Sequence, residues 1–281
     1  MRTFPIGVLL ESFRCDWHEA LKKAAELGLS GVQVYATRGE FAPEVMTKEK
    51  RRAFLDEVKS YGLTISALCG DLGKGFGNSE LNPGLVEQSK RIVELAKDLE
   101  TDIVTTHIGV VPEDPAHPRY AVMQAACRDL AEFADSMQAH FAVETGPERA
   151  VTLKNFLDSL GSKGVSVNLD PANFVMVTGD DPVQAVYTLK DYIVHTHAKD
   201  GRKLLDRDPE IIYHMIEDVI QEGQAFEELP LGRGSVDFGE YLKALEDIGY
   251  TGYLTIEREV GENPAADIAL AADYLRSFFE K

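Results

Sequence analysis

Residues 141–170 read FAVETGPERAVTLKNFLDSLGSKGVSVNLD and contain one complete repeat of the chain. Phe141–Glu144 is β-rich, Leu153–Leu160 has the spacing of an amphipathic helix, and Val165–Asp170 is β-rich again. Parallel neighbouring strands need a crossover connection of this length, which is usually a helix. The stretch therefore predicts one strand–helix–strand unit of a parallel sheet.

The same alternation continues in both directions along the chain. The other β-rich runs are Phe4–Leu10, Gly31–Tyr35, Leu63–Cys69, Asp102–His107, Tyr192–His197 and Tyr253–Glu257. The other clear helical stretches are Trp17–Leu27, Thr47–Tyr61, Leu85–Leu99, Tyr120–Met137 and Phe238–Ile248. Eight strands separated by helices predict an α/β fold, a (β/α)₈ TIM barrel in a single domain over residues 1–281. An open doubly wound sheet is the alternative, but residues 7–17 (GVLLESFRCDW) lack its glycine fingerprint.

Residues 201–230 interrupt the alternation between the seventh strand and its helix. This inserted segment includes an expected extra helix near Pro209–Gln221. Loops that follow barrel strands emerge on the catalytic face, so the segment fits a lid or a pocket wall. It fits equally well a solvated excursion that packs against a neighbouring subunit of a homo-oligomer.

Composition limits the compartment and the partners. The chain is 44% hydrophobic and 27% charged, as in ordinary globular proteins, and its apolar runs are too short to span a membrane. The N-terminal stretch MRTFPIGVLLESF indicates a first strand and not a signal peptide. Three widely spaced cysteines indicate a reducing cytoplasm. A formal net charge of −18 argues against nucleic acid as a partner.

Strands four to eight all end in an ionisable side chain: His107, Glu144, Asp170, His197 and Glu257. In a barrel the carboxyl ends of the strands meet at the face where active sites lie. Two glutamates, one aspartate and one imidazole suit one divalent metal ion, which can be Mn²⁺, Mg²⁺, Co²⁺ or Zn²⁺. Without a cation, three converging carboxylates repel one another. We therefore expect Glu144, Asp170, His197 and Glu257 to be metal ligands.

His195 and His197 point to the same face of one strand because side chains alternate along a strand. His197 lies nearer the strand end, so we assign the metal to it. His195 lies two residues deeper, where a packed and hydrogen-bonded histidine is the expected role. The residues considered for substrate binding are His107, Asn173, His195, Lys199 and Arg233.

Polar residues also follow the first three strands, namely Glu11, Tyr35 and Asp71. They could line the pocket, but ordinary loop polarity is the favoured interpretation. The glycine-rich stretch of residues 70–77 (GDLGKGFG) predicts a mobile rim, because its spacing is weak evidence for a phosphate-binding loop.

At these strand ends the sequence resembles the xylose isomerase-like barrels. This sugar-phosphate isomerase/epimerase group includes the D-tagatose 3-epimerase type and the inosose dehydratases. The matching motifs are VETG at Glu144, NLDPAN at Asp170, HTHAKD at His197 and LTIERE at Glu257. Residues 230–238 (PLGRGSVDF) also resemble the glycine-containing loop of the group. The resemblance covers nearly the whole chain.

The resemblance implies one metal ion held by those four residues. It also implies that Glu144 and Glu257 exchange protons with a small carbohydrate or polyol. We therefore expect a divalent-metal-dependent sugar, sugar-phosphate or polyol isomerase or epimerase that works through an enediolate. A metal makes the carbon beside a carbonyl acidic, and a carboxylate on each face can then move its proton. The alternative is a metal-dependent dehydratase of an inosose or a cyclic keto-acid on the same scaffold.

Two positions depart from the epimerase pattern. Ala150 stands where the pattern has a glutamate, and Asn173 stands where it has a histidine; both normally contact sugar hydroxyls. The departures weaken the case for free-ketose epimerisation and suggest a different substrate. Arg149, Glu148 or Arg202 are considered as replacements.

Two other classes of protein fit the sequence less well. A tri-zinc DNA-repair endonuclease on the same barrel needs more strand-end histidines than His107, His195 and His197, and the acidic surface opposes DNA. A non-enzymatic binding barrel with a degenerate metal site is disfavoured because all four ligand types are present.

Overall fold

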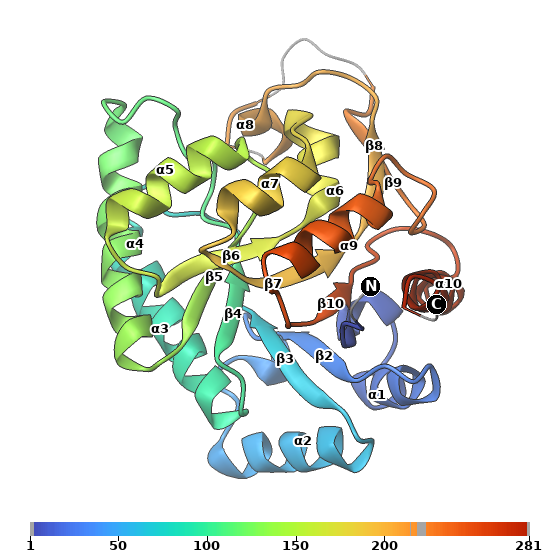
Figure 1. Ribbon diagram of the computed structural model, residues 1–281. Helices are drawn as coiled ribbons and strands as arrows, with labels where there is room; N and C mark the ends of the chain where they lie inside the picture. The colour runs from blue at the N-terminus through green and yellow to red at the C-terminus, as the bar shows by residue number, and fades with distance from the viewer. Residues whose placement is uncertain (1–2, 214, 218–222, 280–281) are drawn as a thin grey trace.

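A computed structural model describes residues 3–213, 215–217 and 223–279 (Figure 1). Parallel strands close into a barrel in the order β1-β10-β7-β6-β5-β4-β3-β2, which confirms the predicted TIM barrel. Their bounds are β1 (Ile6–Leu9), β2 (Gly31–Tyr35), β3 (Thr64–Cys69), β4 (Ile103–Thr106), β5 (His140–Glu144), β6 (Val165–Leu169), β7 (Ile193–Ala198) and β10 (Leu254–Ile256). Each predicted strand range overlaps one of these elements.

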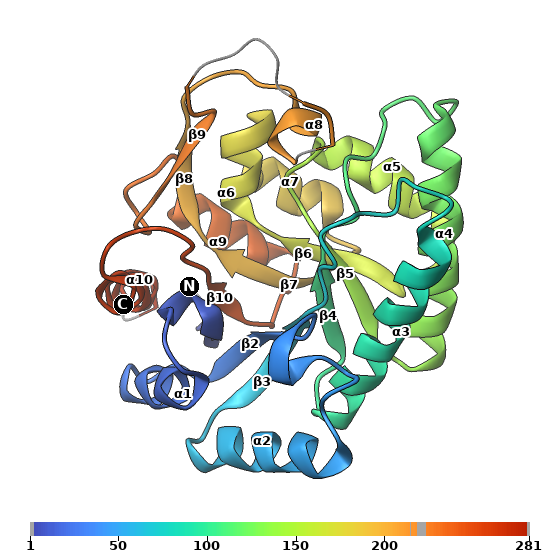
Figure 2. The same cartoon turned by 180° about the vertical axis from the view of Figure 1, so that it is seen from behind.

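Helices surround the barrel as an outer layer (Figures 1 and 2). The larger ones are α1 (Trp17–Glu26), α2 (Lys48–Ser60), α3 (Asn82–Asp98), α4 (Pro118–Ser136), α5 (Ala150–Leu160), α7 (Pro182–Leu189), α9 (Phe238–Asp247) and α10 (Pro264–Arg276). Short turns of helix are η1 (Leu10–Phe13), η2 (Gly39–Phe41), α6 (Pro171–Asn173) and η3 (Phe174–Thr178). The sequence analysis did not single out α7, which is short, or α10, which is rich in alanine. Of the helices described, none is both long and apolar enough to cross a bilayer.

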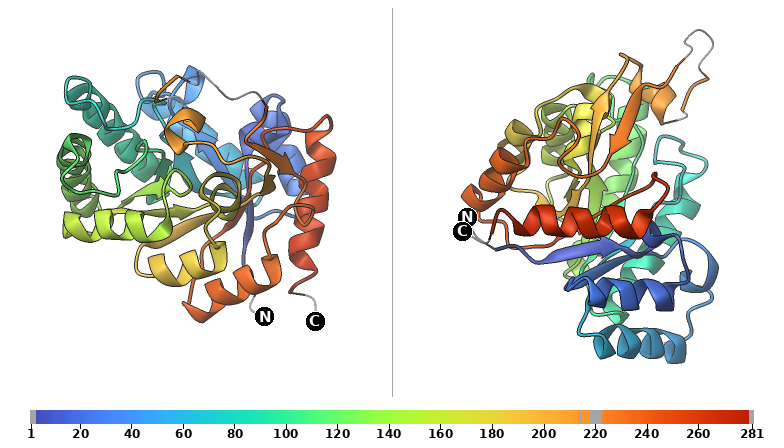
Figure 3. Two further views of the ribbon diagram at one scale, coloured as in Figure 1. Left: turned by 90° about the horizontal axis from the view of Figure 1, so that it is seen from above. Right: turned by 90° about the vertical axis from the view of Figure 1, so that its right-hand side faces the viewer.

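The segment after β7 forms a small antiparallel hairpin that the sequence analysis did not predict. Its strands are β8 (Asp200–Lys203) and β9 (Phe226–Leu229), and α8 (Pro209–Ile212) lies between them in sequence. The hairpin continues from the carboxyl end of β7 and projects away from the barrel (Figure 3). A helix is expected near Pro209–Gln221, but α8 ends already at Ile212. Residues 214 and 218–222 of the expected range lie outside the described residues.

The hairpin is tied to the loop before α9 by one buried carboxylate, that of Asp200. Its Oδ2 accepts hydrogen bonds from the backbone N–H groups of Gly232 (3.0 Å) and Gly234 (2.9 Å), and its Oδ1 accepts one from Val236 (3.1 Å). Such bonds to a charged acceptor are among the stronger ones in proteins. Asp200 thereby fixes the loop that leads into α9.

Strand register gives the barrel a polar interior. Parallel pairing aligns Glu144 with Asn168, Asn168 with His195, and Thr255 with His197, so these side chains share the inner face. Most TIM barrels fill this space with branched apolar residues. Here hydrogen bonds join inner side chains from several strands, namely Gln33, Thr105, Glu144, Asn168, His195, His197 and Thr255.

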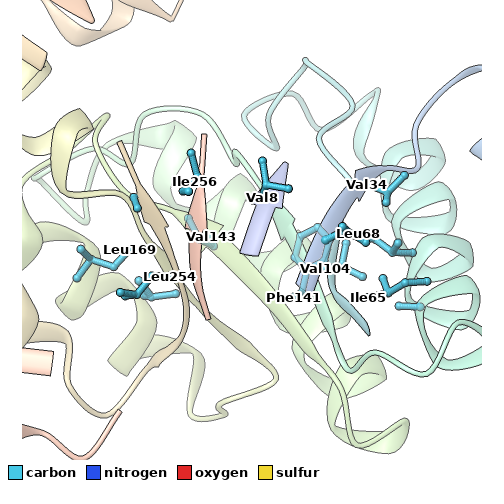
Figure 4. Packing of buried hydrophobic residues seen from close by; sticks show 14 of the residues in the cluster. Val8, Val34, Ile65, Leu68, Val104, Phe141, Val143, Leu169, Leu254 and Ile256 are labelled. Carbon is cyan, nitrogen blue, oxygen red and sulfur yellow. The ribbon is translucent and has the colours of Figure 1, made fainter. Parts of the chain in front are cut away.

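The hydrophobic core consequently lies between the strands and the helices. Val8, Leu68, Val104, Phe141 and Ile256 lie on barrel strands and belong to this core, and each is at most 1% exposed (Figure 4). Burial of such a side chain contributes roughly 1.5–3 kcal/mol. The apolar shell thus stabilises the fold and leaves the interior available for polar groups.

We predict that Gly164, which precedes β6, tolerates no side chain. A Cβ atom there would lie 2.1 Å from the backbone oxygen of Ala131 in α4, so Gly164→Ala must push the helix away from the sheet. Because overpacking costs about 1–3 kcal/mol, the free energy of unfolding should fall by about that amount, measured by urea unfolding followed by circular dichroism.

The matched control for this prediction is Gly84→Ala in α3. A Cβ atom at Gly84 meets no atom within 4 Å. This substitution should leave stability unchanged or raise it by about 0.5–1 kcal/mol, since alanine is the better helix former. Equal effects of the two substitutions would contradict the prediction.

Candidate metal centre

Four ionisable side chains converge at the carboxyl ends of barrel strands. One ligand atom each from Glu144, Asp170, His197 and Glu257 lies within 4.8 Å of the others, and all four residues are buried. Nδ1 of His197 is 3.5 Å from Glu144 Oε1, 3.7 Å from Asp170 Oδ2 and 3.1 Å from Glu257 Oε2. The structure therefore brings together the four residues that the sequence analysis grouped as metal ligands.

The two carboxylate oxygens of Asp170 have different surroundings. Oδ1 caps the short helix α6 by accepting the backbone N–H groups of Ala172 (2.8 Å) and Asn173 (3.1 Å). Oδ2 faces the cluster and is buried without a hydrogen-bond partner among the described residues. Burial raises the pKa of Asp170 above its ordinary value. Because a buried acceptor without a partner is destabilising, this oxygen fits a site built for a cation.

The His197 ring is oriented by Gln33 on β2. The side-chain amide of Gln33 donates from Nε2 to Thr105 Oγ1 (2.9 Å), so its Oε1 is left to accept from His197 Nε2 (3.0 Å). With the proton on Nε2, the other nitrogen, Nδ1, keeps its lone pair, which points towards the three carboxylates. Metal-binding histidines are commonly held by such a second hydrogen bond. Gln33 was not among the predicted site residues, although it is a polar residue within the apolar run GVQVY.

The carboxylates give the cluster a strong preference for positive charge. Although burial opposes ionisation, the carboxylates of Glu257, Glu144 and Asp170 raise the pKa of His197 well above its ordinary value. A divalent cation can offset the negative charge of the carboxylates in the same way as a proton on His197. Three carboxylates with one imidazole suit Mn²⁺, Mg²⁺ or Co²⁺, and also Zn²⁺. The residues present thus fit one divalent metal ion.

Glu144 and Glu257 are supported by different hydrogen-bond donors. Glu144 accepts from the neutral amides of Asn173 (3.1 Å) and Asn168 (3.3 Å). Glu257 accepts from the buried ammonium group of Lys199 (3.2 Å). Burial opposes ionisation of both, yet His197 and His107 lower the pKa of Glu144, and Lys199 and His197 lower that of Glu257. Both side chains are therefore held as carboxylates.

The cluster opens into a cavity of about 240 Å³. Its wall includes His107, Asn173 and Lys199, three of the five residues considered for substrate binding. It also includes Tyr35 and Asp71, which we had interpreted as ordinary loop polarity. The reason for that error is that β2 and β3 end at the same face as the ligand-bearing strands, a relation the local sequence does not display.

The segment after β7 supplies part of the same wall. Ile212 and Tyr213, at the end of α8, and Phe226 on β9 line the cavity. The ring of Tyr213 lies 5.5 Å from the ring of His107, measured between centroids. A ligand in the cavity would therefore touch both the barrel strands and this segment.

His107 is a charged donor on the wall. Its Nδ1 lies 3.1 Å from Asp71 Oδ2, and its Nε2 lies 3.8 Å from Glu144 Oε1. Burial opposes the charge, but Glu144 and Asp71 raise the pKa of His107 to about 9. At neutral pH the ring is therefore protonated and can donate towards the cavity.

His195 lies outside the cavity wall, in the barrel interior. Its Nδ1 donates to Asn168 Oδ1 (2.9 Å), and its Nε2 accepts from Thr255 Oγ1 (3.0 Å). Burial, together with the nearby His197, lowers the pKa of His195 well below its ordinary value. It is a neutral, fully bonded core histidine, the role that its depth in the strand suggested.

The arginines considered for substrate binding also lie away from the cavity wall. Arg233 is exposed on the loop before α9, where its backbone N–H donates to Pro230 O (2.9 Å). Arg149 and Arg202 are exposed and pair with Asp180 (3.5 Å) and Glu227 (2.7 Å). Among the residues that the structure describes, the wall carries no arginine.

Glu148, the remaining candidate, also lies outside the cavity wall. Its Oε2 accepts the backbone N–H of Val111 (3.1 Å), and burial raises the pKa of this carboxyl to about 8. It lines a neighbouring groove of about 550 Å³.

Comparisons with known proteins show the family and the fold. Residues 21–278 match the family model described as xylose isomerase-like TIM barrel. The L-ribulose-5-phosphate 3-epimerase UlaE of Salmonella paratyphi A is 24% identical over 302 aligned positions, which cover 100% of this chain and 96% of that protein.

Solved structures show the same fold. A xylose isomerase domain protein from Planctomyces limnophilus has a TM-score of 0.78 at 27% identity, covering 98% of this chain and 96% of that one. The probable 3-DHS dehydratase AsbF from Bacillus anthracis has a TM-score of 0.76 at 19% identity, covering 99% and 100%. Since the family match spans most of the sequence, the chain belongs to the xylose isomerase-like TIM barrel family.

Proposed function

We propose that this protein is a divalent-metal-dependent isomerase or epimerase of a small carbohydrate or polyol, working by proton transfer through an enediolate. The observation that carries the proposal is the group of four donors at the base of the cavity, with Asp170 Oδ2 lacking a partner among the described residues. The similarity to an L-ribulose-5-phosphate 3-epimerase over the whole chain supports the same class of reaction.

Glu144, Asp170, His197 and Glu257 would hold the ion. A bound divalent ion withdraws charge from the substrate oxygens and so makes the carbon beside the carbonyl more acidic. Gln33 and the helix cap on Asp170 keep the donor atoms in place before the ion arrives. Such pre-positioning reduces the reorganisation that binding requires.

Glu144 and Glu257 are the proposed acid/base pair. Their strands, β5 and β10, are separated by β6 and β7, so the two carboxylates approach the cavity from different sides. Removal of a proton on one face and its return on the other requires this arrangement. A neighbouring cation weakens a carboxylate base. Because Glu257 contacts Lys199, we assign the first proton abstraction to Glu144.

Two substitutions separate the roles of the two histidines on β7. His197→Ala should lower Mn²⁺ affinity by more than about 100-fold, beyond the effect of losing an outer hydrogen bond. His195→Ala should retain Mn²⁺ but lose about 1–3 kcal/mol of stability, since Asn168 and Thr255 lose a buried partner. Isothermal titration calorimetry and urea unfolding measure the two effects. Metal loss in the His195 variant with retention in the His197 variant would mean that the assignment is reversed.

Another prediction tests the proposed reaction with the Mn²⁺-loaded protein in heavy water. Ketoses and inososes that are turned over should acquire deuterium at the carbon beside the carbonyl, as seen by NMR. Glu144→Gln and Glu257→Gln should each slow the exchange by about 10²–10⁴-fold.

Other outcomes of this experiment identify other mechanisms. Product without solvent deuterium, combined with transfer of a substrate label to the adjacent carbon, would indicate an internal hydride shift and contradict the acid/base pair. Loss of water from an inosose, without return of the proton, would identify the dehydratase instead.

A further inference from the structure

The charge around the cavity indicates the class of substrate. Five carboxylates lie on its wall or directly beneath it: Asp71, Glu144, Asp170, Glu257 and Glu259. Their five formal negative charges face at most four positive ones, since Lys199 and His107 can add one each and a divalent ion adds two. The site therefore stays negative even when it is loaded with metal.

The two cationic side chains on the wall are already engaged by carboxylates. Lys199 Nζ lies 3.2 Å from Glu257 Oε2, 3.3 Å from Glu259 Oε2 and 3.9 Å from Glu228 Oε2. His107 is bonded to Asp71. Recognition of phosphate or carboxylate draws on cations that are free to make charge-assisted bonds. Lys199 does not meet that requirement, and His107 has only Nε2, 3.8 Å from Glu144 Oε1, left to donate.

Helix α6, which starts beneath the cavity, does not offer an anion site either. Anions commonly bind the free N–H groups at a helix N-terminus. Here Asp170 Oδ1 already accepts the N–H groups of Ala172 and Asn173.

The groove beside Glu148 shows the same pattern. Arg119 pairs with Glu210, Arg149 with Asp180 and Lys203 with Asp206. The parts of the inserted segment outside the described residues, 214 and 218–222, contain neither lysine nor arginine. Arg207 also lines the groove and donates to Gly223 O (2.9 Å). A phosphate on a substrate that reached into this groove would therefore compete with acceptors of the protein for all four of these cations.

We infer that the substrate is an uncharged, hydroxylated carbonyl compound, an inosose or a free ketose, and not a sugar phosphate or a keto-acid. Because Ala150 and Asn173 stand where the epimerase pattern has residues that contact sugar hydroxyls, the hydroxyls of this substrate would be bound by other residues than in those epimerases. This inference rests on the proposed function and names its substrate class. It also separates this protein from the similar L-ribulose-5-phosphate 3-epimerase, whose substrate carries a phosphate.

The test compares matched pairs with the Mn²⁺-loaded protein. Free ketoses, L-ribulose among them, are assayed beside their phosphate esters, and inososes beside cyclic keto-acids. We expect kcat/KM for the uncharged member to exceed that for the charged one by about 100-fold or more. Preference for the charged members overturns the inference and leaves the proposed function intact.

Binding provides a readout that does not depend on turnover. If no compound reacts, the proposed function fails. The substrate class is then decided by thermal shift, in which uncharged members should raise Tm and their phosphate esters should not. Stabilisation by the esters alone overturns the inference.

A substitution that removes negative charge beside Lys199 gives an additional test. Glu259→Gln removes one carboxylate from Lys199, so the ratio of kcat/KM should shift towards the phosphate esters by roughly three- to tenfold. Glu262→Gln, an exposed position on the same loop, is the matched control and should leave the ratio unchanged. An equal ratio in both variants and the native protein contradicts the charge argument.

A separate observation concerns Tyr213. Its hydroxyl lies over Gly146, two residues beyond Glu144, where an added Cβ atom would come within 3.1 Å of Tyr213 Oη. Tyr213 lines the cavity, and its hydroxyl makes no hydrogen bond with any of the described residues. Burial, with the carboxylates of Glu144, Glu148 and Asp170, raises the pKa of Tyr213 well above its ordinary value, so the phenol keeps its proton.

The geometry points to Tyr213 as a substrate-binding residue that donates its hydroxyl to an oxygen of the bound sugar. Tyr213→Phe should therefore lower kcat/KM roughly tenfold while Mn²⁺ affinity stays unchanged. Tyr192→Phe, whose hydroxyl donates to the distant Asp158, is the control and should behave as the native protein.

Deoxy analogues distinguish this contact from a packing effect. One analogue lacks the hydroxyl or carbonyl oxygen that Tyr213 contacts. Its kcat/KM should be low with the native protein, and Tyr213→Phe should not lower it further. If every analogue loses the same factor with both proteins, or the variant matches the native protein on all substrates, Tyr213 does not contact the substrate.

Discussion

Mutual repulsion of buried carboxylates is the constraint on which the rest of this structure depends. Glu144, Asp170 and Glu257 lie around one imidazole in a space from which water is largely excluded. Such a group is stable only with compensating positive charge. Lys199 and protonated His107 supply part of it from the wall, and the remaining demand is concentrated at the point shared by the four donors. The repulsion among the carboxylates is therefore also the reason why the site favours a divalent metal ion.

The barrel accommodates this charge because its interior is a hydrogen-bonded network and its apolar core lies outside the strands. Within the network, two histidines on one strand have opposite properties. Gln33 turns the lone pair of His197 towards the carboxylates, whereas Asn168 and Thr255 occupy both nitrogens of His195. The partners that the barrel places beside each ring, more than depth alone, decide which imidazole can bind a metal.

Local patterns in the sequence were sufficient to predict the strands and the four grouped donors, since each donor directly follows or ends an apolar run. They were insufficient for contacts between distant segments. Gln33 and His197 are 164 residues apart, and nothing near Gln33 indicates the pairing. Strands β8 (DGRK) and β9 (FEEL) are too polar for the usual strand signal and form through backbone pairing with each other. Tyr213 follows α8, in the connection between these two strands, and still reaches the cavity.

The origin of the wall residues along the chain has an evolutionary consequence. The four donors come from four separate strands, so no single local change can rebuild them. Ile212, Tyr213 and Phe226 all belong to one connection between β7 and α9, which Asp200 anchors at its base. Insertions and replacements within that connection can alter which molecule is accepted while the reaction chemistry is inherited unchanged. Lineages of this barrel can thus diversify in substrate by remodelling one exchangeable loop.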